Sequence, residues 1–133
     1  MSGAVREKKL NLLFTSAGRR SYLIRFFREA LGGEGKIFAA NSSPLSTALQ
    51  EADEAVITPL IYDGSYIPFL LDYCRKHRID ALMSLFDVDL PVLAQHKEAF
   101  AAQGTRVLVS DPGFIGICND KWKTFCFLKE RLR

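Results

Sequence analysis

Two arginines that follow a glycine are the residues of this sequence whose types and spacing best suit ligand binding. Gly18, Arg19 and Arg20 stand in the segment TSAGRRSY, between a short apolar run and a segment with a helical pattern. A helix N-terminus presents unpaired N–H groups and the positive end of the helix dipole, so a small-residue loop leading into it favours an anion. Arginine adds bidentate contacts to a carboxylate or phosphate. We expect an anion site here, the alternative being two solvated arginines in a first helical turn.

Four further residues are expected near that loop because each follows a predicted strand. Asn41 and Ser42 come after one strand, and Asp87 and Asp89 come after another, at the start of a helix. In open parallel sheets, ligands bind at the carboxyl ends of the strands. Either aspartate could meet a substrate amine or hydroxyl, although capping of the helix explains at least one of them. The candidate substrate or anion site therefore comprises Gly18, Arg19, Arg20, Asn41, Ser42, Asp87 and Asp89.

Several familiar sites are absent from the sequence. The first loop lacks the GxGxxG pattern and no acidic residue follows the second strand, so neither NAD binding nor an independent dehydrogenase is expected. There is no Walker A motif. His77 and His96 lack partners at ligand spacing, and we expect neither a metal site nor a catalytic residue in this chain. Cys74, Cys118 and Cys126 have no CxxC spacing, so reduced and mostly buried thiols are expected.

Size and composition indicate one domain without a nucleic-acid or membrane partner. The chain has 133 residues, of which 48% are hydrophobic and 25% charged, a mixture typical of a domain with its own core. Much of the net charge of +3 comes from the two tails rather than from a basic stripe, which argues against nucleic acid. No apolar stretch is long enough to span a membrane, and none precedes the first strand as in a secretory signal. We therefore expect a cytoplasmic protein.

The elements that must position the candidate residues alternate between strands and helices. Strands are predicted at Leu10–Phe14, Lys36–Asn41, Glu54–Thr58, Ala81–Phe86 and Arg106–Ser110. Helices are predicted up to Leu31, over Leu45–Ala52 and Ser65–Arg78, from Leu90 to a stop at Gly104, from Asp111-Pro112 to Ile117, and from Lys121 to about Leu132, capped by Asn119 or Asp120. Each parallel connection needs a crossover, so this alternation predicts an α/β fold with a doubly wound, parallel, five-stranded sheet of Rossmann-like type.

Apolar spacing predicts which side chains face the core. Phe14 is expected under the first helix, whose buried stripe is predicted to hold Tyr22, Leu23, Phe26, Phe27, Ala30 and Leu31. The third helix is expected to bury Ile67, Leu70, Leu71 and Cys74. In the last helix the apolar residues are Trp122, Phe125, Cys126 and Leu128, and we expect Trp122 and Phe125 in the core rather than in a stacking platform.

Four segments, taken in order, resemble one known family. They are TSAGRRSYLIRFFREAL at the first strand-to-helix turn, FDVDLPVLAQHKEAF after the fourth strand, VLVSDP at the fifth strand and NDKWKTFCFLKE near the end. Together they resemble the N-terminal, pre-ATP-grasp domain of the ATP-grasp ligases, most of all the proteins similar to the large subunit of carbamoyl-phosphate synthase. The resemblance covers nearly the whole chain. It implies a Rossmann-like pre-ATP-grasp domain over residues 1–118 and, over 119–133, a helix leading toward an ATP-grasp domain.

The resemblance implies that this chain is the substrate-side domain of an ATP-dependent carboxylate–amine ligase. Such ligases activate a carboxylate as an acyl phosphate and couple it to an amine or similar nucleophile, with ATP and Mg²⁺ as cofactors of the complete enzyme. The lysine matching Lys121 reaches the ATP phosphate in the family. The ATP lid and the Mg²⁺-binding carboxylates lie downstream, so we expect the chain that stops at Arg133 to be inactive alone, without a cofactor of its own.

Other interpretations stay open at this point. The alternative function is a free-standing Rossmann-like module that binds a small anion or nucleotide. The expected partners are an ATP-grasp domain, in the same or a separate chain, and a small carboxylate or amine substrate. The sequence does not specify that substrate, whether the chain is an enzyme in itself, or whether it forms a homodimer.

Overall fold

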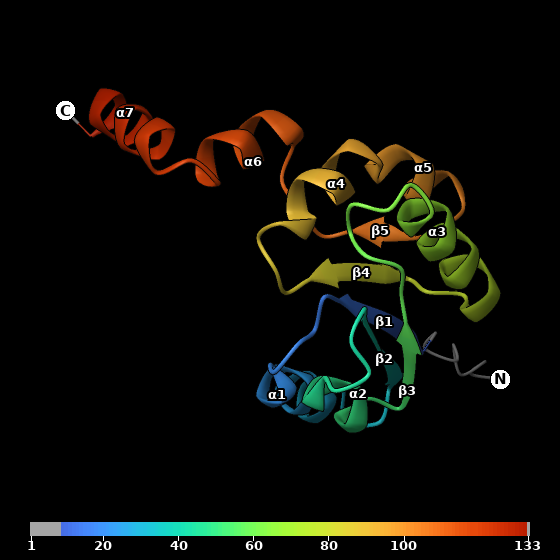
Figure 1. Cartoon of the computed structure of the whole chain (residues 1–133). Coiled ribbons are helices and arrows are strands. Elements are labelled where there is room, and N and C mark those ends of the chain that lie inside the picture. Colours follow the sequence, from blue (N-terminus) through green and yellow to red (C-terminus); the bar gives the residue numbers. More distant parts are fainter. Residues whose placement is uncertain (1–8, 133) are drawn as a thin grey trace, which may run out of the picture.

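Five parallel strands form one sheet in the computed structural model, which describes residues 9–132 (Figure 1). In chain order they are β1 (Leu10–Thr15), β2 (Gly35–Asn41), β3 (Glu54–Ile57), β4 (Ala81–Ser84) and β5 (Arg106–Val107). Their order across the sheet is β3-β2-β1-β4-β5, so β1 is central and the strand order reverses between β1 and β4. The predicted doubly wound, parallel, Rossmann-like α/β fold is therefore confirmed. Most of the basic N-terminal tail, together with Arg133, lies outside the described residues.

Helices cover both faces of the sheet, as crossover connections require. They are α1 (Ser21–Leu31), α2 (Thr47–Glu51), α3 (Tyr66–His77), α4 (Asp89–Gln95), α5 (Lys97–Ala102), α6 (Pro112–Cys118) and α7 (Lys121–Arg131). Successive strand residues point to opposite faces, so Leu13 joins the core under α3, α4 and α5, whereas Phe14 joins the core under α1 and α2. Phe14 is 1% exposed, which confirms its predicted place beneath the first helix.

The buried face of α1 differs from the predicted stripe. Ile24 is fully buried and Phe27 is half-buried, whereas Tyr22 and Phe26 are 47% and 59% exposed. Tyr22 and Phe26 each stand two positions from Ile24, which is about 200° around a helix and therefore on the opposite side. Their rings form an edge-to-face pair on the outer surface, with centroids 6.1 Å apart. Ala30 is also exposed, whereas Leu23 and Leu31 are half-buried and Leu31 packs with Phe27 against the core, so the predicted stripe was right in part.

The predicted helix after the fourth strand is two helices, α4 and α5, that meet at His96. The ring Nδ1 of His96 lies 2.8 Å from the carbonyl oxygen of Val92, and the His96 N–H donates to Leu93, one residue short of the helical partner. This local bonding interrupts the regular pattern. The last strand is also shorter than predicted, because the N–H of Val109 turns back to the carbonyl of Val107. The predicted fourth strand likewise ends at Ser84 rather than at Phe86.

The last two helices extend away from the sheet (Figure 1). Asp120 caps α7, since its carboxylate accepts from the N–H of Lys123 at 2.9 Å, which decides between the two predicted caps. No side chain of α7 is buried, and Trp122 and Phe125 are 71% and 52% exposed, so their predicted core position is wrong. Burial of Trp122 and Phe125 would require another element to pack over them. Whether one does depends on the tertiary structure, and residues 9–132 provide none.

Two other predictions were right in part. In α3, Leu70 and Cys74 are buried as expected, whereas Ile67 and Leu71 are half-buried. Of the three free thiols, Cys74 alone is buried, so the expectation of mostly buried cysteines is wrong. Among residues 9–132, no helix has both the length and the apolar character needed to cross a membrane.

Candidate functional site

A hollow of about 260 Å³ opens at the carboxyl edge of the sheet, where the first four strands end; we call it the crevice. Its lining comes from the loops after β1, β2, β3 and β4, and consists of Ser16, Gly18, Arg20, Asn41, Ser42, Thr58, Pro59, Ile61 and Phe86. The structure therefore brings four of the seven predicted site residues to one place. Because β1 and β4 flank the reversal of strand order, the crevice lies where ligands bind in doubly wound sheets.

The loop after β1 has a left-handed backbone that is held by its neighbours. Ser16 and Gly18 have φ angles of 49° and 54°. The N–H of Gly18 donates to Oδ1 of Asn41 at 3.2 Å, and its carbonyl accepts from the hydroxyl of Ser46 at 2.5 Å and the N–H of Ala48 at 3.2 Å. The peptide groups of Gly18 are thus committed to the protein, and this glycine shapes the crevice rather than donating to a ligand.

The charge of the crevice comes from the start of α1. Arg20 is the residue before the helix, no side chain caps it, and no acidic residue stands in the first turn. Arg20 is exposed and lines the crevice, whereas Arg19 is exposed but outside the lining. Neither arginine forms an ion pair with another residue of the described range 9–132. The guanidinium of Arg20 and the positive end of the helix dipole together favour an anion.

Asp89 lies beneath the crevice rather than on its surface, since it is 0% exposed. Its Oδ2 accepts hydrogen bonds from the hydroxyls of Thr15 at 2.7 Å, Ser16 at 3.0 Å and Ser84 at 2.8 Å. Its Oδ1 accepts from the hydroxyl of Tyr66 at 2.9 Å. Burial, followed by the nearby charge of Asp89, raises the pKa of Tyr66 well above its ordinary range, so Tyr66 keeps the proton that it donates.

Asp87 and Lys121 lie together in a second hollow of about 420 Å³ between α4, α6 and the start of α7. Asn119, which also lines this hollow, donates from Nδ2 to the carbonyl of Asp87 at 3.0 Å. Phe86 lines the crevice and Asp87 lines this second hollow, so the two spaces adjoin at consecutive residues. Six of the predicted site residues are therefore divided between these two spaces, whereas Arg19 and Asp89 line neither.

Sequence reasoning missed part of the crevice. Thr58, Pro59 and Ile61 follow the third strand, and applying the strand-end rule to that strand would have found them. Phe86 was assigned to a strand that ends earlier. Asp111, which follows the predicted fifth strand, lines neither hollow and caps α6 by accepting from the N–H of Phe114 at 2.9 Å.

Two further observations bear on what the site can do. A larger hollow, of about 650 Å³, lies between α5 and β5, but none of the predicted site residues line it. Within residues 9–132, no three histidine, cysteine or acidic side chains converge to hold a metal ion. The crevice combines one cation with hydroxyl, amide and apolar groups, an arrangement suited to binding a small anion.

Comparisons with known proteins place the fold. Residues 12–108 match the family model of the PylC-like N-terminal domain, whereas curated protein sequences give no significant match. Among solved structures, an L-amino acid ligase from Bacillus licheniformis is 21% identical with a TM-score of 0.68, covering 92% of this chain and 29% of that chain. Glycinamide-RNase-transformylase T from Mycobacterium tuberculosis is 14% identical with a TM-score of 0.65, covering 92% of this chain and 35% of that chain.

A third solved structure is an ADP complex. It is that of N5-carboxyaminoimidazole ribonucleotide synthetase, which is 13% identical with a TM-score of 0.65, covering 98% of this chain and 31% of that chain. At identities this low, the similarity establishes the fold alone. The chain spans about a third of the length of these solved proteins.

Proposed function

Because the chain belongs to the family of PylC-like N-terminal domains, we propose that it is the substrate-side domain of an ATP-dependent carboxylate–amine ligase. The observation that carries the proposal is the crevice, with Arg20 at the reversal of strand order in the sheet. The fold shared with an L-amino acid ligase supports it. The substrate is a small molecule whose anionic group, a carboxylate or phosphate, meets the guanidinium of Arg20.

The other lining residues take complementary roles in this proposal. Asn41 and Ser42 offer an amide and a hydroxyl beside the arginine, while Ile61 and Phe86 contact the less polar part of the substrate. Asp87 lines the adjoining hollow, where it accepts a hydrogen bond from an amine or hydroxyl of the substrate that extends there from the crevice. Gly18 shapes the loop, Arg19 adds positive potential from outside the lining, and Asp89 supports the crevice from beneath.

ATP and Mg²⁺ belong to the complete enzyme in this proposal, on an ATP-grasp domain in the same or a separate chain. Lys121, exposed at the first turn of α7, reaches the ATP phosphates from this side. Residues 119–133 connect the two domains. The exposure of Trp122, Phe125 and Leu128 supports this, since large apolar side chains gathered on one protruding helix are typical of a surface that another domain covers. The 133-residue chain without that domain is inactive as a ligase in this proposal.

One observation favours a second candidate function, a free-standing module that binds a small anion or nucleotide. All residues of this chain that line the crevice lie between Ser16 and Phe86, and none belongs to α7. Such a module would bind its ligand fully without a further domain, whereas the ligase proposal requires only weak binding by this chain.

Titration of the chain with acetate and with inorganic phosphate, followed by NMR, tests the crevice. Charge-assisted contacts in an open, hydrated crevice gain little net free energy, so we expect a Kd on the order of millimolar. Arg20→Ala should raise that Kd about tenfold, because it removes the lining guanidinium. Arg19→Ala is the matched control, a second exposed arginine at the same helix start, and should change the Kd less than about twofold. Equal effects of the two substitutions would refute the assigned role of Arg20.

Kinetics decide between the two candidate functions. In a longer chain that includes an ATP-grasp domain, Lys121→Ala should raise the KM for ATP, while Arg20→Ala should chiefly impair use of the acceptor substrate. Wild-type kinetics for both variants would remove both residues from the site. Micromolar binding of a nucleotide by residues 1–133 alone would instead support the free-standing module.

A further inference from the structure

One buried carboxylate joins the segments that meet beneath the crevice. Asp89 receives hydrogen bonds from the end of β1, from the loop after it, from the end of β4 and from the start of α3. No described basic side chain forms an ion pair with it. A carboxylate accepts about four hydrogen bonds, so the four hydroxyl donors fill its capacity. Burying such a group is costly unless it is hydrogen-bonded, and the four hydroxyl donors supply those bonds.

Two of these contacts reach the walls of the crevice, and both use the same oxygen. Ser16, which begins the loop that ends at Arg20, donates to Oδ2 of Asp89 at 3.0 Å. Ser84 donates to the same Oδ2 at 2.8 Å, and its hydroxyl oxygen also accepts from the N–H of Phe86 at 3.2 Å. The walls formed by the first loop and by Phe86 are therefore joined through Oδ2.

The backbone of Ser16 is held in a conformation that residues other than glycine rarely adopt. A residue other than glycine in the left-handed region, here with φ of 49°, is strained and persists only where surrounding contacts determine it. The side-chain bond to Asp89 is such a contact, since it fixes the hydroxyl of the strained residue. Without it, the loop could relax toward the ordinary right-handed or extended regions.

We propose that Asp89 is a positioning residue, which holds the loop from Ser16 to Arg20 and the turn at Phe86 in their ligand-binding arrangement before a ligand arrives. The importance of that arrangement rests on the proposed function. The arrangement itself can be measured without any ligand, so the two proposals can fail separately.

Amide hydrogen exchange of the ligand-free 133-residue chain tests this role. Asp89→Asn keeps the shape of the side chain but replaces one acceptor oxygen with an NH₂ donor. We expect the amides of Gly18 and Phe86 to exchange about tenfold faster relative to the strand amides of β1. A residue with a merely structural role would affect global stability, and all of these amides would then accelerate together.

Thr15→Val is the matched control, because it removes a hydroxyl donor to the same Oδ2 from within a strand. It should lower overall stability and leave the ratio of loop to strand exchange unchanged. An unchanged ratio in Asp89→Asn, or an equal change in Thr15→Val, would overturn the proposal. If Asp89→Asn does not fold, Ser16→Ala decides: selective acceleration at Gly18, with Phe86 unaffected, supports the role, and no selective acceleration overturns it.

Binding provides the second readout. In the acetate titration, Asp89→Asn should raise the Kd about tenfold and Thr15→Val should leave it within about twofold. Unaltered acetate binding by Asp89→Asn would refute a positioning role. Failure of the wild-type chain to bind acetate or phosphate would count against the proposed function, while the exchange ratio would still decide the role of Asp89.

Discussion

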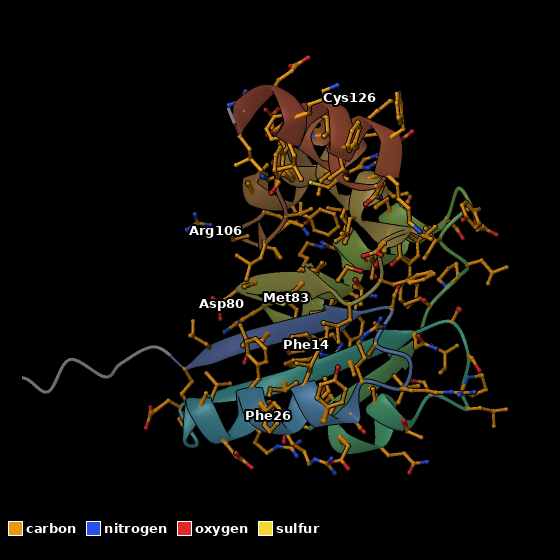
Figure 2. All side chains as sticks on the ribbon, turned by 90° about the vertical axis from the view of Figure 1, so that its left-hand side faces the viewer. Phe14, Phe26, Asp80, Met83, Arg106 and Cys126 are labelled. Carbon is orange, nitrogen blue, oxygen red and sulfur yellow. The ribbon has the colours of Figure 1, made fainter. Side chains whose placement is uncertain are left out.

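Replacing Phe14 with alanine tests how α1 is anchored on the sheet. Phe14 lies in the central strand, in register with Ala39 of β2 and Met83 of β4. Figure 2 labels Phe14 and Met83. Its ring meets that of Phe27 edge to face, with centroids 4.9 Å apart, and it is 1% exposed. The substitution would remove this ring from between the sheet and the helix and leave a cavity in its place.

The expected loss follows from that burial. A buried Phe→Ala change costs about 3–5 kcal/mol, to which the lost ring pair contributes, and a domain of this kind has about 5–15 kcal/mol of stability in total. Phe26→Ala is the matched control, because Phe26 is on α1, the helix that packs over Phe14, but is 59% exposed (Figure 2). A surface substitution of this kind should change the free energy of unfolding by less than about 0.5 kcal/mol.

Urea denaturation followed by far-UV circular dichroism measures both variants. Trp122 is 71% exposed on α7, so its fluorescence is a poor reporter of the core. The slope of the free energy against urea should stay constant, which shows that the change lies in stability rather than in the compactness of either state. A loss below about 1 kcal/mol for Phe14→Ala, or equal losses for the two variants, would refute the assigned packing of α1.

Two further predictions concern the thiols and the glycines. Burial raises the pKa of the Cys74 thiol from 9.0 to about 12, so at pH 8 a disulfide reagent should modify the exposed Cys118 in the native chain and reach Cys74 only in urea. Because the folded state holds this proton more tightly, the Cys74 contribution to stability is complete below pH 9 and is lost as the pH rises toward 12, a loss that Cys74→Ala should reduce. A Cβ at Gly35 would lie 2.3 Å from the carbonyl oxygen of Leu10, so Gly35→Ala should cost about 1–3 kcal/mol in a urea titration. Gly116→Ala, where a Cβ meets nothing within 4 Å, should cause no loss, and equal stabilities would contradict the close approach of the two strands.

The fold and the family could be read from the sequence. The resemblance to the N-terminal domain of ATP-grasp ligases is confirmed by the matched family of PylC-like N-terminal domains, and solved structures that include an L-amino acid ligase share the fold. Both depend on local patterns: apolar runs of strand length, helical segments between them, and motifs in order. The bounds of β1 and β2 agree with prediction to within one residue, because apolar strand segments and glycine-rich ends are local signals.

The buried faces of the helices were less predictable. Tyr22, Leu23, Ile24, Phe26 and Phe27 are apolar almost all around the first turns of α1, so several faces fit the same periodicity. The sheet selects the face with Ile24, which packs with Phe14. In α7 the apolar residues recur at helical spacing, but Trp122 and Phe125 can be buried only if another element packs over them. No element of the described chain does so.

The sequence by itself determined which residues stand at strand ends, and so brought Gly18, Arg20, Asn41 and Ser42 into the candidate site. This was possible because parallel strands end at a common edge. Only the tertiary structure decided that Asp87 and Lys121 share a separate hollow and that Asp89 lies beneath the crevice. The hydroxyl donors to Asp89 stand 74, 73, 23 and 5 positions away along the chain. A hydrogen-bond network over such separations depends on packing distances and side-chain directions, which no local spacing in the sequence records.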